Sequence, residues 1–139
     1  MTHDANQLKG TLITKALNRA ERAIECGFYL EALALCDSLI TDRIRVIGAH
    51  SSSILIEVRG VNNGIDNLNH AKVELLDAGL IDETRKWGKS RNAAIHGFSK
   101  LTEFDGTTWN SRLKETKMQA QRGLELSKRW LAEARRHRL

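Results

Sequence analysis

Residues 28–47 read FYLEALALCDSLITDRIRVI, and this strongly apolar stretch decides the fold class. Its apolar residues recur at intervals of three and four, which is the spacing of an α-helix with one buried side. A helix this apolar is expected to be the most buried element of a bundle. The residues expected on its buried side are Leu33, Leu35, Leu39, Ile40, Ile44 and Ile47.

The composition of the whole chain agrees with a helical fold. The 139 residues are enough for one domain with a single modest core. Proline is absent, aromatic residues are few, and alanine, leucine, lysine, arginine and glutamate are plentiful. The β-leaning signal is limited to ILIEV, residues 54–58. We therefore expect an all-α fold, a four- or five-helix up-and-down bundle formed by a single domain over residues 1–139.

Four further helices are expected around this central one. The first covers 6–25 and ends near Gly27. Its inward side is expected to hold Leu8, Leu12, Ala16, Ala20, Ala23 and Ile24. Residues 48–53 fit either a short helix or a loop. A turn-rich connection is expected over 60–67, followed by a helix from Asn67 to Gly79 with Leu68, Ala71, Leu75 and Leu76 inward. Asp82 is expected to open the next helix, and a loop over 102–110 leads to a long last helix capped by Ser111.

Positive charge is concentrated near the C-terminus. The formal net charge is +5, yet residues 1–110 hold 13 Lys and Arg against 14 Asp and Glu, whereas residues 111–138 hold 9 against 3. A solvated helix face is one explanation of such a segment. Basic excess also attracts polyanions such as RNA through screened attraction and counterion release.

Several classes of protein are disfavoured by what the sequence lacks. No apolar run approaches the length of a membrane span and no signal-peptide pattern is seen, so we expect a cytoplasmic protein with no membrane association. Cys26 and Cys36 are ten residues apart and are expected to be buried free thiols. No two histidines have zinc-helix spacing and no glycine-rich phosphate loop occurs, so neither a metal site nor a cofactor is expected.

The stretch KSRNAAIHGF, residues 89–98, holds the side chains best suited to chemistry. Asn92 and His96 are four residues apart on a helix, so they share a face and the amide can orient the imidazole. Arg91 and His96 are five apart, which places them about 140° from each other around the helix axis. A straight helix therefore does not aim both at one small target.

The residues just before this stretch are basic. Arg85, Lys86, Lys89 and Arg91 provide four cations within seven positions, and an anion is the natural ligand of such a surface.

Two carboxylates on the apolar central helix need partners. Arg91 is one candidate partner for Asp37, whereas Asp42 is expected to pair with its neighbours Arg43 or Arg45.

The order Arg91, Asn92, three residues, His96 and Gly97 resembles the signature of the HEPN superfamily (higher eukaryotes and prokaryotes nucleotide-binding domains). That signature is an arginine, four to six residues and a histidine, commonly with a polar residue such as asparagine directly after the arginine. Its setting is also similar, because LIDETRKWGKS precedes the motif and a loop and one long helix follow it. The segments ALALCDSLITDRIRVI and LNHAKVELLDAG are similar in character to HEPN helices, so the resemblance covers nearly the whole chain.

The resemblance implies a homodimer built around the motif and a metal-independent endoribonuclease of the toxin or phage-defence type. RNA is then the expected substrate, and an antitoxin or other regulatory protein an expected partner. Under this hypothesis His96 transfers protons, Arg91 binds the phosphate and its transition-state charge, and Asn92 orients the site. Arg85, Lys86 and Lys89 would bind RNA. The products would be a 2′,3′-cyclic phosphate and a 5′-hydroxyl.

Two other interpretations stay open. The chain could be a HEPN-like module that binds RNA, a nucleotide or a protein without cutting, or a bundle in which Arg91 and His96 only hold the fold together. The sequence also departs from one HEPN pattern: some HEPN toxins carry, two residues after the histidine, a tyrosine that a partner nucleotidyltransferase adenylylates. Phe98 occupies that position, so the resemblance does not extend to this form of silencing.

Overall fold

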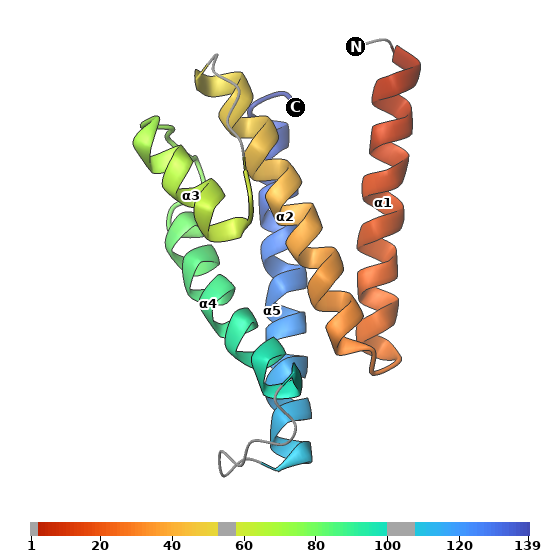
Figure 1. Cartoon of the computed structure of the whole chain (residues 1–139). Coiled ribbons are helices and arrows are strands. Elements are labelled where there is room, and N and C mark those ends of the chain that lie inside the picture. The colour runs from red at the N-terminus through yellow and green to blue at the C-terminus, as the bar shows by residue number, and fades with distance from the viewer. Residues whose placement is uncertain (1–2, 53–57, 100–107) are drawn as a thin grey trace.

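The computed structural model describes residues 3–52, 58–99 and 108–139 (Figure 1). Within these ranges the chain forms five α-helices and no strand, so the predicted all-α fold is confirmed. The helices are α1 (His3–Glu25), α2 (Tyr29–Ser52), α3 (Val61–His70), α4 (Leu80–Ser99) and α5 (Trp109–Arg136).

The four long helices run up and down beside one another, and the short α3 lies against α2 and α4 (Figure 1). Helix α5 packs on both α2 and α4, while α1 packs mainly on α2 and less extensively on α5. The turn between α1 and α2, the C-terminal end of α4 and the N-terminal end of α5 all lie toward one end of the bundle (Figure 1). No helix within the described ranges combines the length and hydropathy needed to cross a membrane.

Helix α2 is the centre of the core, as its sequence predicts. Leu33, Ile40 and Ile47 are fully buried, Ile44 and Leu39 are nearly so, and Leu35 is half-buried. Because α2 contacts α1, α3 and α5, its apolar side is covered along most of its length.

Two tryptophans fill the space between α4 and α5. Trp87 is 1% exposed and donates from its indole nitrogen to the carbonyl of Gln119, at 2.8 Å. Trp130 donates to the hydroxyl of Thr84, at 2.9 Å. Gly123 permits this packing, since a Cβ there would lie 2.7 Å from a ring carbon of Trp87.

The end of α1 is predicted correctly, and its inward stripe is predicted correctly only in its second half, where Ala20 and Ala23 are buried. Gly27 has φ +84°, and the N–H of Phe28 donates to the carbonyl of Ala23, which is the expected glycine-terminated helix end. Leu8 and Leu12, however, are 63% and 59% exposed. The reason is that α1 lies at the edge of the bundle, where α2 and α5 cover only one side of it.

The predicted connection over 60–67 is wrong, because this segment begins α3. Val61, Ile65 and Leu68 recur at helical spacing and are all buried. Gly64 lies against α2, where a Cβ would come within 2.8 Å of Ile44. Gly64 therefore allows close packing of α3 on α2 and does not form a turn.

The helix predicted over 67–79 is correspondingly wrong. Helix α3 ends at His70, and the chain then continues without helical structure to Gly79. Lys72 has φ 56°, which interrupts any helical continuation. Leu76, expected to face inward, is 69% exposed, whereas Leu75 is half-buried.

Smaller expectations have mixed outcomes. Residues 48–52 extend α2, and Thr108 rather than Ser111 caps α5, since the N–H of Ser111 donates to the Thr108 hydroxyl. Cys36 is a buried free thiol as predicted, but Cys26 is exposed because it lies in the turn after α1. Residues 54–57 of ILIEV and 102–107 of the expected loop lie outside the described residues.

Candidate functional site

Helix α4 carries its polar side chains on two distinct faces. At 100° per residue, Arg85, Lys89, Asn92 and His96 fall within about 60° of one another around the helix axis. Lys89, Asn92 and His96 are exposed and Arg85 is partly exposed. We refer to these four residues as the α4 outer stripe, which extends about 16 Å along the helix at 1.5 Å per residue.

Arg91 lies on the other face, at least about 100° from every residue of the outer stripe. Its side chain is only 18% exposed, and its Nη1 atom lies 3.3 Å from Oδ1 of Asp37 on α2. Its guanidinium carbon lies 5.7 Å from the centre of the Trp87 ring, a cation–π contact. The structure thus confirms Asp37 as the partner of Arg91.

The environment of this ion pair is unusual for a carboxylate beside an arginine. Burial raises the pKa of Asp37 above its usual 3.8, and the Arg91 charge opposes that shift without overcoming it. Oδ1 of Asp37 and Nε of Arg91 form no hydrogen bond with any described residue. The pair is therefore held by proximity and packing, with hydrogen-bonding capacity left over.

Two more buried polar atoms, one on α2 and one on α3, also lack a hydrogen bond to a described residue. Thr41 lies one turn after Asp37 on α2, and Asn62 lies on α3 with its Oδ1 near Gly88 of α4. The Thr41 hydroxyl and Asn62 Oδ1 are buried and have no hydrogen-bond partner in the described part of the chain. Neither residue was predicted from the sequence. The four-residue spacing from Asp37 was the available signal for Thr41, and none existed for Asn62.

His96 and Asn92 are placed as the sequence predicts. Both side chains are exposed, and their four-residue separation sets them side by side on the outer stripe. His96 lies in the last turn of α4. The imidazole is accessible to a dissolved ligand, whereas the guanidinium of Arg91 faces α2, so one protomer does not bring these two groups together.

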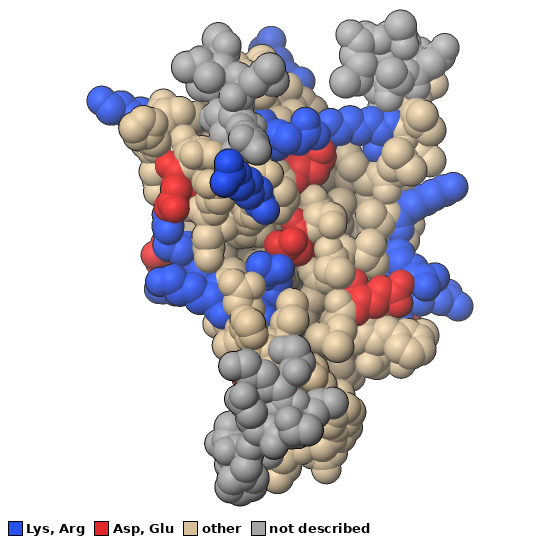
Figure 2. Space-filling view, viewed as in Figure 1, with Lys and Arg blue, Asp and Glu red and all other residues tan. Residues whose placement is uncertain are grey.

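The four predicted cations are less open than the sequence implies. Arg85 pairs with Asp66 at 2.7 Å, and Lys86 pairs with Asp82 at 3.1 Å. Of these cations only Lys89 has no ion pair with a described residue. Figure 2 shows acidic side chains interleaved with basic ones over the face in view. Exposed ion pairs contribute about 0–1 kcal/mol each, so phosphates can compete for Arg85 and Lys86.

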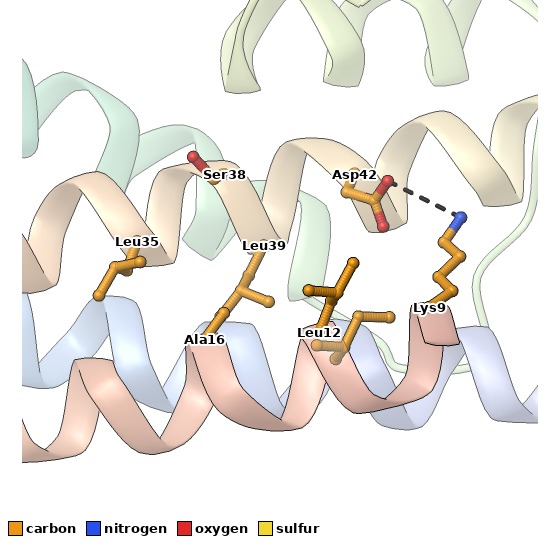
Figure 3. A pocket seen from close by; sticks show the side chains of 8 residues that line it. Lys9, Leu12, Ala16, Leu35, Ser38, Leu39 and Asp42 are labelled. Atoms are coloured by element: carbon orange, nitrogen blue, oxygen red, sulfur yellow. Dashed lines mark ion pairs between the residues drawn. The ribbon is translucent and has the colours of Figure 1, made fainter. Parts of the chain in front are cut away.

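A separate groove of about 290 Å³ lies between α1 and α2 (Figure 3). Leu12, Ala16, Leu35 and Leu39 line it, and Lys9 and Asp42 close one end with a 3.9 Å ion pair. Its α2 residues lie about 100° or more around the helix from Asp37, so this groove is not part of the Arg91 site.

Asp42 at the end of this groove is held as the sequence predicts. Arg43 donates to it through Nε at 3.1 Å, and Arg45 donates through Nη2 at 2.6 Å. Burial raises the pKa of Asp42, but the hydrogen bonds and charges of its cationic neighbours outweigh burial and leave the pKa below 3.8.

Within the described residues, no cluster of three or more His, Cys, Asp or Glu side chains could hold a metal ion. Comparisons of the sequence with protein-family models, with curated proteins and with solved structures found no match. The residues of α4 and their contacts are therefore the basis for any function assigned to this chain.

Proposed function

We propose that the protein is a metal-independent endoribonuclease that acts as a homodimer through Arg91 and His96 of both protomers. The observation that supports this most is the arrangement on α4: an exposed His96 beside an exposed Asn92, and a partly buried Arg91 on an adjoining face. The resemblance of these residues to the HEPN motif supports the same function.

The residue types match the chemistry of RNA cleavage. A base must remove the proton of a ribose 2′-hydroxyl, an acid must protonate the departing 5′-oxygen, and the charge on the phosphorus must be stabilised. Histidine titrates near neutral pH and suits both proton transfers. Arginine keeps its charge and offers planar donors to the phosphorane oxygens.

A two-fold dimer supplies what one protomer lacks. Each protomer offers one motif histidine, and its Arg91 points about 140° away from it. In an isologous interface that includes α4, Arg91 of one copy lies beside His96 of the other, and the two copies of His96 act as base and acid. The products are a 2′,3′-cyclic phosphate and a 5′-hydroxyl.

The contacts of Arg91 support a role in phosphate binding. A guanidinium has five N–H donors, and Nη1 of Arg91 lies 3.3 Å from Oδ1 of Asp37. The guanidinium carbon of Arg91 lies over the Trp87 ring, 5.7 Å from the ring centre. Arg91 is therefore oriented by one carboxylate and one ring. Its Nε is buried, so a phosphate would meet the 18% of the side chain that remains exposed.

The test is RNA cleavage in the presence of EDTA by the wild-type protein, His96→Ala and Arg91→Ala. We expect cleavage to survive chelation in the wild type and to yield a cyclic phosphate. In both variants the rate should fall at least about 100-fold, while their circular dichroism and melting temperatures stay close to wild type. His70→Ala is the matched control, because His70 is an exposed histidine in the last turn of another helix, α3. Cleavage unaffected by His96→Ala would contradict the proposal.

The second candidate is a module that binds RNA without cutting it. It is favoured by the outer stripe itself, which places Arg85, Lys89 and Asn92 in line without requiring chemistry. Binding without product, unchanged in His96→Ala, would identify this function. A large fall in melting temperature in Arg91→Ala would instead favour a structural role for the pair with Asp37.

As a toxin or phage-defence effector, the nuclease would be restrained by an antitoxin or another regulatory protein. The expected outcome of unrestrained expression is arrested growth, relieved by His96→Ala. If the wild type and His96→Ala arrest growth equally, the toxicity does not come from RNA cleavage.

A further inference from the structure

One end of the bundle holds an apolar groove of about 310 Å³ that the proposed chemistry does not use. The α1–α2 turn forms one wall through Phe28, Tyr29 and Leu30. The other wall comes from Phe98 in the last turn of α4 and from Trp109 and Leu113 in the first turns of α5. These three segments lie toward the same end of the molecule (Figure 1).

The aromatic rings of this groove are unusually open to solvent. Trp109 is 56% exposed and Phe28 is 61% exposed. Phe98 meets Trp109 edge to face, with ring centres 5.2 Å apart, so the indole is oriented by its neighbour. Oriented, accessible rings of this kind are the platforms on which proteins stack unpaired bases.

The charges around the groove fit a polyanion. Arg112 and Lys117 lie on α5 within one turn of the lining residues Trp109 and Leu113. One acidic residue, Glu31, also lines the groove, and Arg19 donates to its carboxylate at 2.7 Å. The acid is thus already neutralised by a cation.

The groove adjoins the proposed reaction centre along the chain. Phe98 follows His96 by two residues in the same helical turn, although it faces the inner side of α4. Phe98 and His96 are therefore separated by only about 3 Å along the axis of α4, although they lie on opposite faces of it.

We propose that this groove is a base-binding subsite that takes one unstacked nucleobase of single-stranded RNA next to the scissile phosphate. The proposal rests on the proposed ribonuclease function and adds the substrate class, single-stranded rather than duplex RNA. Bases in a duplex are already stacked and paired, so they cannot enter. A volume near the lower limit of small-molecule sites suits one base and not a longer segment.

Tryptophan fluorescence offers a direct measurement of this subsite. The chain has three tryptophans, and Trp87 and Trp130 are 1% and 0% exposed. Trp109 is therefore the indole that a dissolved base can quench. The probe is a short single-stranded RNA with 2′-O-methyl groups, which binds but cannot undergo attack by its 2′-oxygen, and its binding is followed independently by fluorescence anisotropy.

We expect this RNA to quench the exposed tryptophan signal, and duplex RNA or inorganic polyphosphate to leave it unchanged. Trp109→Ala should weaken binding of the single strand about 5- to 100-fold, as loss of one base stack does, and Trp109→Phe should restore most of it. Phe28→Ala should also weaken binding of the single-stranded RNA. Met118→Ala is the matched control, since Met118 is 53% exposed on α5 and does not line the groove.

The outcomes separate the two proposals. If the single strand binds by anisotropy but neither quenches Trp109 nor loses affinity in Trp109→Ala, the subsite is overturned and RNA binding stands. Equal quenching by polyphosphate would also overturn it. If no RNA binds at all, the proposed function fails, and the subsite with it.

Discussion

Asp37 and Asp42 lie on the same helix, and each exposes 29% of its side chain, yet they are stabilised in opposite ways. Arg43 and Arg45 hydrogen-bond to Asp42, and Lys9 adds a third positive charge. The pKa of Asp42 is therefore below 3.8. Asp37 has one cation at 3.3 Å, Oδ1 makes no hydrogen bond to a described residue, and its pKa rises.

The difference separates a carboxylate that several cations hydrogen-bond, Asp42, from one that a single arginine holds without a hydrogen bond to Oδ1, Asp37. Burial acts on both carboxylates, so burial alone cannot explain the contrast. The contrast comes from the number of cationic donors near each carboxylate, since two arginines hydrogen-bond to Asp42 and a single arginine lies near Asp37. Arg91 is held by one ion pair of 3.3 Å to an oxygen that makes no hydrogen bond, so its exposed part can bind a phosphate without first breaking a strong interaction.

Arg91→Ala should have the largest effect. Loss of a preorganised cation from the site should lower the rate of RNA cleavage about 100- to 1,000-fold, and Arg91→Lys should recover part of it, because lysine keeps the charge but not the planar donors. Single-turnover cleavage by folded protein measures this. Arg45→Ala is the control, since Arg45 binds the saturated Asp42 and is expected to leave cleavage unchanged. Equal losses in the two variants would erase the distinction between the pairs.

Asp42→Ala should have the next largest effect, on stability. Its removal leaves the charge of Arg43, whose side chain is 6% exposed, without its main partner. We expect the free energy of unfolding to fall by about 2–3 kcal/mol, less than for a fully buried pair because Asp42 itself is partly exposed. Urea denaturation measures the loss. Asp66→Ala, which breaks the exposed pair with Arg85, should cost less than about 1 kcal/mol.

The two carboxylates should also respond oppositely to pH. Asp42 has a lowered pKa in the folded state, so its contribution to stability is present above pH 3.8 and is lost as the pH falls through the folded value. Asp37 has a raised pKa, so its contribution is present below pH 3.8 and is lost as the pH rises through the folded value.

Carboxyl NMR titration of the folded protein measures both values directly. We expect the Asp37 midpoint above 3.8 and the Asp42 midpoint below it, and Arg91→Ala should raise the Asp37 midpoint further because it removes the opposing charge. Midpoints in the reverse order would contradict the contrast.

The sequence predicted the parts of the fold that depend on local periodicity. The buried side of α2, the glycine end of α1 and the separation of Arg91 from His96 all follow from helical spacing. The residues over 60–67 were misread because glycine and asparagine favour turns in general, whereas Gly64 serves the close approach of α3 to α2.

Contacts between distant segments could not be read from the sequence. Glu133 looks like a surface residue of a charged helix, yet it is fully buried and accepts hydrogen bonds from the backbone N–H groups of Leu76 and Asp77. The aromatic groove is a further case, because Phe28, Phe98 and Trp109 come together only when three helix ends meet.

Lys9→Gln should have the smallest effect, and it tests whether Arg43 and Arg45 are sufficient to hold Asp42. Lys9 lies 3.9 Å from Asp42, its side chain is 34% exposed, and two arginines already hydrogen-bond the same carboxylate. A third, solvent-screened cation adds little, so the free energy of unfolding should change by less than about 0.5 kcal/mol and the Asp42 midpoint should rise only slightly. A large rise would mean that Asp42 depends on α1 and is not saturated by its own helix, and the contrast with Asp37 would then be one of degree.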